Sequence, residues 1–193
     1  MSRKIVFIFG SPRENGNTRV LMERAMKAAR EAGATVEEIN AVKLKHTVPG
    51  CSGCLWCKKA GEFRCVIGDE VARQVGRLPE YDTIVFATPV YWLSYSAQIK
   101  IFIDRMYCLV QFLEDGIKSP LSGKTLALIS SGGGTLEGNL EVLEEQFLST
   151  TKIIGAHYTG LLLPLAPVDP GAIADDGEAM RKAAEFGRSL ALE

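Results

Sequence analysis

Short, nearly continuous apolar runs alternate with longer amphipathic segments along most of this 193-residue chain. The runs at residues 5–9, 83–87 and 125–130 have the composition of strands that are buried on both faces. Each run is followed by a segment with helical spacing, such as residues 18–32, which stops at Gly33. Because right-handed crossovers connect such strands, the alternation predicts an α/β fold with a parallel sheet covered by helices on both faces.

Two further segments complete the predicted sheet. Residues 35–39 are typical of an exposed edge strand, and residues 153–163 indicate a last strand. Five such strands suit a doubly wound, flavodoxin-like sheet with order 2-1-3-4-5, in which ligands bind beyond the carboxyl ends of the strands. The length predicts one domain over residues 1–193. The other predicted helices lie at about residues 97–110, 136–150 and 177–192.

Composition narrows the classes of partner. With 22 basic and 23 acidic residues, the chain has no overall field that favours nucleic acid or a membrane surface. The apolar run near the start is too short for a signal sequence or a membrane span, so we expect a cytoplasmic protein whose thiols stay reduced. Small molecules or redox proteins remain as partners.

The segment after the first strand, GSPRENGNT, combines glycines, hydroxyls and Arg13 just before a helix. Backbone N–H groups and the helix dipole favour an anion at such a position. The segment is not a P-loop, because five residues separate Gly10 from Gly16 and Asn17-Thr18 follows where a lysine is required. The segment does not match the GxGxxG motif either, which disfavours a Rossmann dinucleotide-binding site here. A turn that merely caps the helix is the alternative, but the length of the polar segment favours a phosphate-binding loop.

Two more loops follow predicted strands. TPVYWLS, after the third strand, offers a rigid proline and two aromatic side chains, although a cap on the core or a subunit interface would have the same composition. SSGGGT, after the fourth strand, permits close approach of backbone to a ligand, or is simply flexible. All three loops share the predicted crevice. Together they predict a site for a mononucleotide with a planar ring.

The motifs GSPRENGNT, TPVYW followed by QIKIFIDR, and SSGGG resemble the NAD(P)H-dependent FMN reductase and iron–sulfur flavoprotein group of the flavodoxin-like superfamily, over residues 4 to about 150. The resemblance implies FMN as cofactor and a homodimer or homotetramer with FMN near a subunit interface. The resemblance also implies that the FMN phosphate is held by Ser11, Arg13, Asn17 and Thr18. It implies that the isoalloxazine lies against Pro89, Val90, Tyr91 and Trp92, and that its other side faces Ser131, Gly132 and Gly133.

Within QIKIFIDR, Lys100, Asp104 and Arg105 match the K-x-F-x-D-R pattern of that group. We expect them to anchor the helix or to contact another subunit rather than to act in catalysis. The alternative for Lys100 and Asp104 is an i,i+4 surface pair.

A cysteine-rich loop at about residues 46–68 carries CSGCLWCKKAGEFRC. Its Cys51, Cys54, Cys57 and Cys65 form C-x2-C-x2-C-x7-C, which suits the corners of a [4Fe–4S] cluster and fits the compact motif of iron–sulfur flavoproteins. Relatives also carry C-x-G-C-x-x-C loops, with a later cysteine before an acidic helix start, without a cluster. Zinc and disulfides are further alternatives, the latter disfavoured in a reducing compartment. We interpret Cys108 as a side chain that fills the core or an interface, and His46 as a surface residue.

These features predict an FMN-binding oxidoreductase with no catalytic side chain of its own. With a cluster, it would relay single electrons between an iron–sulfur donor and FMN. Without one, it would be an NAD(P)H-dependent FMN or quinone-type reductase. A hypothesis of another class is a non-catalytic flavodoxin-like binding module, although a phospho-receiver needs an aspartate where Thr88-Pro89 stands. We expect residues 109–122 to cover the flavin.

Overall fold

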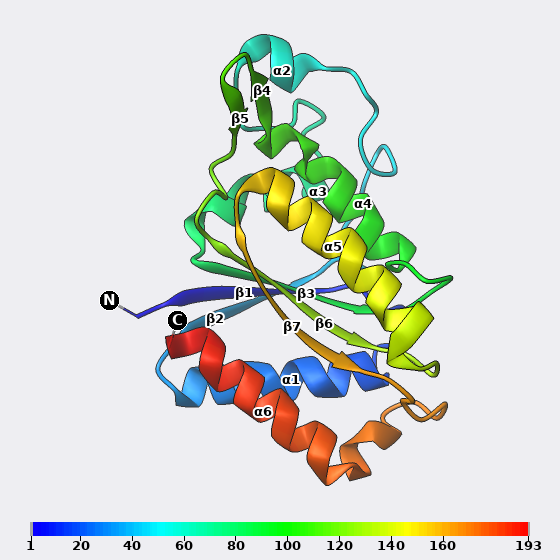
Figure 1. Cartoon of the computed structure of the whole chain (residues 1–193). Helices are drawn as coiled ribbons and strands as arrows, with labels where there is room; N and C mark the ends of the chain where they lie inside the picture. The colour runs from blue at the N-terminus through cyan, green and yellow to red at the C-terminus, as the bar shows by residue number, and fades with distance from the viewer. Residues whose placement is uncertain (1, 193) are drawn as a thin grey trace.

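A computed structural model of the chain, which describes residues 2–192, contains a five-stranded parallel sheet with the order β2-β1-β3-β6-β7 (Figure 1). Counted without the two strands of a separate hairpin, this is the predicted order 2-1-3-4-5. The predicted fold class is therefore confirmed. The sheet strands are β1 (Lys4–Phe9), β2 (Thr35–Asn40), β3 (Thr83–Pro89), β6 (Thr125–Ser131) and β7 (His157–Leu163).

Helices cover both faces of the sheet, and the strands supply apolar side chains to each side in alternation. In β1, Phe7 packs into the core under α1 and α6, while Ile8 packs into the core under α3, α4 and α5. The longer helices are α1 (Asn17–Glu31), α3 (Glu70–Arg77), α4 (Ala97–Arg105), α5 (Glu141–Ile154) and α6 (Gly177–Leu192), and the short helical segments are α2 (Trp56–Ala60), η1 (Leu78–Glu80), η2 (Met106–Leu109), η3 (Leu136–Leu140) and η4 (Ala172–Asp175).

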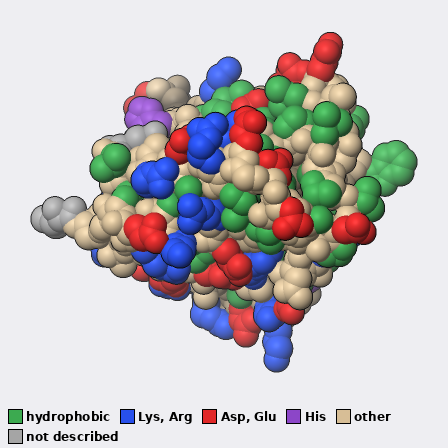
Figure 2. All heavy atoms as spheres, turned by 90° about the horizontal axis from the view of Figure 1, so that it is seen from below, with side chains coloured by type: hydrophobic (Ala, Val, Ile, Leu, Met, Phe, Trp, Pro, Cys, Tyr) green, Lys and Arg blue, Asp and Glu red, His purple; other side chains and the backbone are tan. Residues whose placement is uncertain are grey.

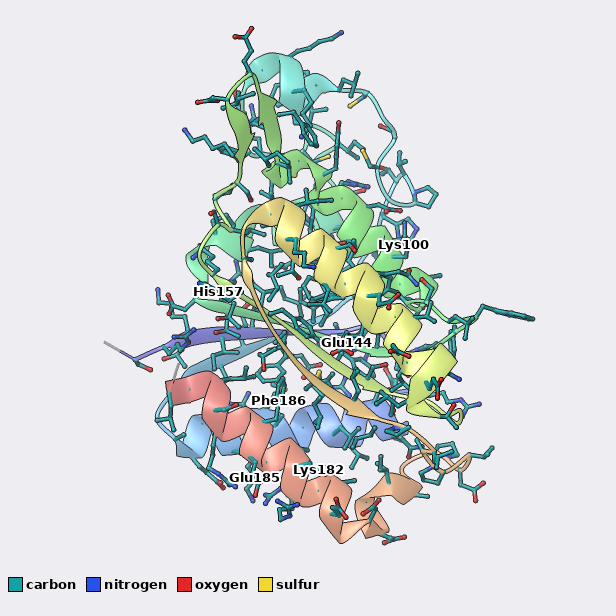
Figure 3. All side chains as sticks on the ribbon, in the orientation of Figure 1. Lys100, Glu144, His157, Lys182, Glu185 and Phe186 are labelled. Atoms are coloured by element: carbon teal, nitrogen blue, oxygen red, sulfur yellow. The ribbon has the colours of Figure 1, made fainter. Side chains whose placement is uncertain are left out.

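The layer formed by α1 and α6 is tightly packed. A Cβ at Gly187 of α6 would lie 2.1 Å from the Ala25 carbonyl oxygen of α1, so only glycine permits this approach. Lys182 and Glu185 lie on the outer side of α6, while Phe186 turns toward the core (Figure 3). The face seen from below mixes basic and acidic side chains without a patch of one sign (Figure 2). This arrangement agrees with the balanced charge of the sequence.

Some predicted boundaries are wrong. The last strand begins at His157 and not at residue 153, because α5 continues to Ile154 and ends at Gly155 with φ of 75°. The helix predicted at 97–110 ends at Arg105 and continues as the tighter turn η2. The helix predicted at 136–150 is divided by a kink, where Gly138 has φ of 67°.

The segment predicted to cover the flavin instead forms the antiparallel hairpin β4 (Gln111–Leu113) and β5 (Gly116–Lys118) beside the cysteine loop (Figure 1). The Gln111 side-chain amide donates to the carbonyl oxygens of Cys57, at 2.9 Å, and Glu62, at 3.2 Å. That prediction is therefore corrected: the hairpin packs on the cysteine loop and does not line the crevice. Within residues 2–192, no helix combines the length and the apolar character that a membrane span requires.

Candidate functional site

A cavity of about 200 Å³ lies at the carboxyl ends of β1, β3 and β6, where the three predicted loops meet. Every residue predicted from the resemblance to hold FMN lines it, except Trp92. The loop after β7 supplies a fourth wall that the sequence reasoning missed. The lining residues are Ser11, Arg13, Gly16, Asn17, Thr18, Pro89, Val90, Tyr91, Ser131, Gly132, Gly133, Ala166, Pro167 and Val168.

The start of α1 opens into this cavity without a side-chain cap. Gly16 occupies the N-cap position, no side chain accepts a hydrogen bond there, and the first turn holds no acidic residue. The Thr18 and Ser131 hydroxyls, both buried, lie 3.2 Å apart, and the Ser11 hydroxyl accepts the Arg13 N–H at 3.2 Å. The loop therefore does not serve as a cap. It leaves N–H groups and hydroxyls at the positive end of a helix, which is the arrangement that binds anions.

Two of the predicted phosphate ligands also hold a wall of the cavity. The Asn17 side-chain amide donates to the Pro167 carbonyl at 2.7 Å, and its oxygen accepts the Ile173 N–H at 3.2 Å. The Arg13 guanidinium donates to the Val168 carbonyl at 3.4 Å. Both ends of the Asn17 side chain are thus engaged in fixing the loop after β7. The sequence signal for this wall was the proline-rich stretch LPLAPVDPG, which follows the last strand toward the same sheet edge.

Trp92 lies outside the cavity, at the tip of a tight turn between Tyr91 and Ser94. Its side chain is 100% exposed, and its backbone is left-handed, with φ of 49°. Gln146 of α5 holds the turn, because its amide donates to the Leu93 carbonyl at 3.0 Å and its oxygen accepts the Ser94 hydroxyl at 2.9 Å. The turn is therefore fixed with Tyr91 facing the cavity and Trp92 facing solvent.

The thiols of the cysteine loop line a second, much smaller cavity of about 20 Å³. Cys51 and Cys54 are exposed, Cys65 is half-buried, and Cys57 and Cys108 are buried. All five thiols are free, and in residues 2–192 no three His, Cys, Asp or Glu side chains converge closely enough to hold a metal ion. Four thiolates around one cavity are the donor set that a [4Fe–4S] cluster requires. The donor set fits a cluster, and ligation requires the thiols to turn inward.

The surroundings of the thiols change how readily they ionise. Burial raises the pKa of Cys108 to about 12 and also raises the pKa of Cys57. The pKa of Cys54 is lowered by hydrogen bonds from the Trp56 N–H and the Ser52 hydroxyl. Cys108 therefore stays a protonated filler, as interpreted from the sequence, although it lines the same cavity.

The K-x-F-x-D-R residues divide into two kinds. Lys100 and Asp104 form an exposed i,i+4 pair at 2.5 Å, and Lys100 lies on the outside of α4 (Figure 3). Arg105 has a side chain that is 1% exposed and pairs with Asp69 at 2.9 Å, beneath the cysteine loop. The surface-pair alternative thus describes Lys100 and Asp104, and Arg105 is a buried anchor.

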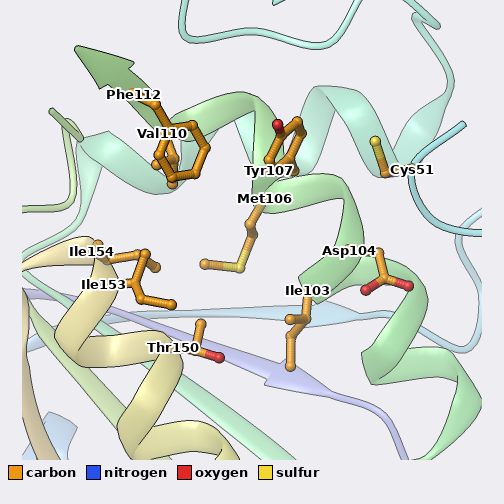
Figure 4. A pocket seen from close by; sticks show the side chains of 10 residues that line it. All are labelled: Cys51, Ile103, Asp104, Met106, Tyr107, Val110, Phe112, Thr150, Ile153 and Ile154. Carbon is orange, nitrogen blue, oxygen red and sulfur yellow. The ribbon is translucent and has the colours of Figure 1, made fainter. Parts of the chain in front are cut away.

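A third cavity, of about 490 Å³ and mostly apolar, lies between α4, α5 and the β4–β5 hairpin (Figure 4). Cys51 and Asp104 stand at one side of it, and Phe112 and Ile153 on its rim are 57% and 53% exposed. Its lining consists of Cys51, Ile103, Asp104, Met106, Tyr107, Val110, Phe112, Thr150, Ile153 and Ile154.

A doubly wound parallel sheet with an uncapped helix start and a glycine loop at its carboxyl edge defines a protein of the flavodoxin-like class. Within that class, the family model described as NADPH-dependent FMN reductase matches residues 3–160, and the chain belongs to this family. It is a flavin-dependent oxidoreductase, and the hypothesis of a non-catalytic binding module is not needed.

Among similar proteins are an iron–sulfur flavoprotein of Archaeoglobus fulgidus, 31% identical over 97% of this chain and 79% of that protein, and one of Methanocaldococcus jannaschii, 31% identical over 97% and 95%. A solved structure, the NAD(P)H:quinone oxidoreductase from Methanothermobacter marburgensis, has a TM-score of 0.77 at 19% identity and covers 98% of this chain and 100% of its own. These findings confirm the resemblance and the enzyme class that the motifs indicated.

Proposed function

We propose that the 200 Å³ cavity binds FMN with its phosphate at the start of α1. The observation that carries the proposal is the uncapped first turn of α1, beside the hydroxyls of Ser11, Thr18 and Ser131. Backbone N–H groups and neutral hydroxyls are sufficient for this task, because they act together with the helix dipole. In this assignment Asn17 and Arg13 hold the wall after β7, and Arg13 can release its single long bond to reach the phosphate.

The isoalloxazine ring is assigned to the mouth of the cavity, between two kinds of surface. Pro89, Val90 and Tyr91 form one side, and the backbone of Gly132 and Gly133 forms the other. A Cβ at Gly132 would lie 3.3 Å from the Leu140 side chain and 3.4 Å from the Val90 side chain, so there is little room for a side chain at this position. Bound FMN supplies the redox chemistry, and the residues of this chain bind it, orient it and exclude water.

The test is a titration of the apoprotein with FMN and, in parallel, with riboflavin, followed by flavin fluorescence. Anchoring at the helix start predicts that riboflavin, which lacks the phosphate, binds at least about 100-fold more weakly, since charge-assisted hydrogen bonds are individually the strong ones. Equal affinity for the two flavins would contradict the placement of the phosphate at the start of α1.

We further propose that Cys51, Cys54, Cys57 and Cys65 hold a [4Fe–4S] cluster that exchanges single electrons with the flavin site. Support comes from the four thiols around one cavity and from the two relatives, which are iron–sulfur flavoproteins. The second candidate is a cluster-free NAD(P)H-dependent quinone-type reductase. It is favoured by thiols that do not converge and by the fold shared with a quinone oxidoreductase.

One anaerobic preparation separates the two candidates. About four irons and four sulfides per chain, with a broad visible shoulder beneath the flavin bands, support the cluster. Flavin bands alone, with steady-state reduction by NADPH or NADH and no mediator, support the cluster-free reductase. Comparing the two nucleotides in the same assay identifies the donor.

We also propose that the chain forms a homodimer or homotetramer through the apolar rim of the 490 Å³ cavity. Phe112 and Ile153 are large, exposed apolar side chains that line the rim of that cavity. Exposed apolar patches of this kind mark interaction sites. Light scattering on the wild type and on Ile153→Glu tests this. A monomeric wild type, or an oligomer that Ile153→Glu leaves intact, would exclude this face as the interface.

A further inference from the structure

The segment that precedes the cysteines is fastened to Arg105, the last residue of α4. The Arg105 Nε–H donates to the Gly50 carbonyl at 2.8 Å, and Nη2 donates to the Val48 carbonyl at 2.8 Å. Because Gly50 directly precedes Cys51, these two bonds fix the point at which the cysteine loop leaves the body of the protein.

The segment that follows the cysteines is fastened to the same guanidinium. Nη1 and Nη2 donate to the two carboxylate oxygens of Asp69, at 2.9 and 3.2 Å. Asp69 in turn caps α3 by accepting the Ala72 N–H at 2.9 Å, and it accepts the Thr47 N–H at 3.1 Å. The start and the end of the loop are therefore tied together at one buried ion pair.

The remaining N–H of Arg105 is directed at a thiol. Nη1 lies 3.7 Å from the Cys65 sulfur, which is within hydrogen-bonding distance for sulfur. A guanidinium has five N–H donors, and in Arg105 all five have an acceptor. Four of them hold the loop ends, and the fifth faces Cys65, which is separated from Cys57 by seven intervening residues.

We propose that Arg105 is the positioning residue of a thiolate metal centre in this loop, which holds Cys65 toward the shared cavity and faces the negative charge of four thiolates. This inference rests on the cluster proposed above. It assigns the arginine of the K-x-F-x-D-R segment a role beside the metal site rather than in catalysis or in the flavin crevice. A lysine cannot replace it, because an ammonium has three donors and no planar fork.

The experiment uses the reduced, full-length protein without its cluster, titrated anaerobically with Co²⁺ while thiolate-to-cobalt charge-transfer absorption is followed. The wild type is expected to bind one Co²⁺ per chain. Arg105→Lys is expected to bind it about 10–100-fold more weakly, as is typical when a partner of a metal ligand is removed. Its charge-transfer intensity per bound cobalt should also fall to that of Cys65→Ser, which has three thiolates of the set left.

Arg77→Lys is the matched control, because Arg77 makes a similar fork to Glu37, at 2.8 and 2.9 Å, and its other hydrogen-bond partners are Gln74 and Tyr81 rather than a thiol. It should bind Co²⁺ like the wild type. The spectrum per bound cobalt distinguishes positioning from mere destabilisation, since a less stable protein binds less metal with an unchanged spectrum.

The outcomes separate this inference from the functions it rests on. Wild-type affinity and spectrum in Arg105→Lys overturn the inference alone, whereas a wild type that binds FMN but no Co²⁺ overturns the thiolate centre together with it. If Arg105→Lys fails to fold by circular dichroism, nuclear magnetic resonance on the wild type decides. The signal of the buried Arg105 Nε–H should shift when Cd²⁺ is added, and an unmoved signal contradicts the inference.

Discussion

The 200 Å³ cavity proposed to bind FMN, here called the crevice, and the cysteine loop are built in different ways. The crevice consists of loop backbone at the ends of neighbouring strands, with buried hydroxyls 3.2 Å apart and an open helix start. The cysteine loop is a long excursion between β2 and α3 whose thiols range from buried to exposed and do not converge. The crevice thus follows from sheet topology, whereas the loop depends on one buried guanidinium.

The largest expected effect follows from removing that guanidinium. Arg105→Ala leaves the Asp69 carboxylate buried without its cation, which should lower the free energy of unfolding by about 3–5 kcal/mol. Urea denaturation measures it. Lys100→Ala, which breaks the neighbouring exposed pair, should change stability by no more than about 0.5 kcal/mol. Similar losses in the free energy of unfolding of the two variants would show that the buried pair stabilises the protein no more than the exposed pair does.

A smaller effect is expected from pH. Burial alone would raise the pKa of Asp69, but hydrogen bonds from the Ala72 N–H and from Arg105 hold it below its usual value. The unfolded chain therefore takes up a proton at higher pH than the folded protein does. The stabilisation is complete above the ordinary aspartate pKa of about 4 and is lost as the pH falls through the folded value.

Urea denaturation from pH 7 to pH 3 checks this dependence. Asp69→Asn, which keeps a residue suited to capping α3, should show a shallower loss of stability than the wild type. Asp115→Asn on the exposed hairpin turn is the control and should follow the wild type. Parallel curves for the wild type and Asp69→Asn would contradict the assignment.

The same contrast explains what the sequence could predict. The apolar runs of β1, β3 and β6 are buried on both faces, so their composition alone indicated the sheet and placed at one edge the three loops that line the crevice. The shift of the last strand arose because Ile153 and Ile154 are equally apolar in a helix end and in a strand. The five contacts of Arg105 and the double role of Asn17 join residues distant in sequence, and no local pattern encodes them.

A moderate effect is expected within the crevice. Thr18→Val keeps the shape of a buried side chain but removes its hydroxyl bond to Ser131, and it should weaken FMN binding about 5–10-fold, near the 1 kcal/mol of one hydrogen bond. Fluorescence titration measures it. Thr151→Val is matched, since its buried hydroxyl donates to the Phe147 carbonyl at 2.9 Å in α5, away from the crevice. Equal FMN affinities in the two variants would show that the Thr18 hydroxyl does not contribute to FMN binding.

The smallest effect is expected at Trp92, whose side chain is outside the crevice. Trp92→Gly relieves a left-handed backbone by about 1–2 kcal/mol, and the greater freedom of glycine in the unfolded chain offsets most of this gain. Stability should therefore change little, and FMN affinity should stay within about twofold, because no hydrogen bond to the ligand is lost. Tyr91→Ala, which removes a wall of the cavity, should weaken binding more.

Thermal denaturation and FMN titration of Trp92→Gly and Tyr91→Ala test the contrast between the two regions directly. A crevice that is formed before the ligand arrives has no need of a side chain pointing into solvent, so only Tyr91 should matter. If Trp92→Gly instead loses as much affinity as Tyr91→Ala, the turn held by Gln146 must rearrange over the bound ring. The flavin site would then require a movement to close, as the cysteine loop does, and topology alone would not account for it.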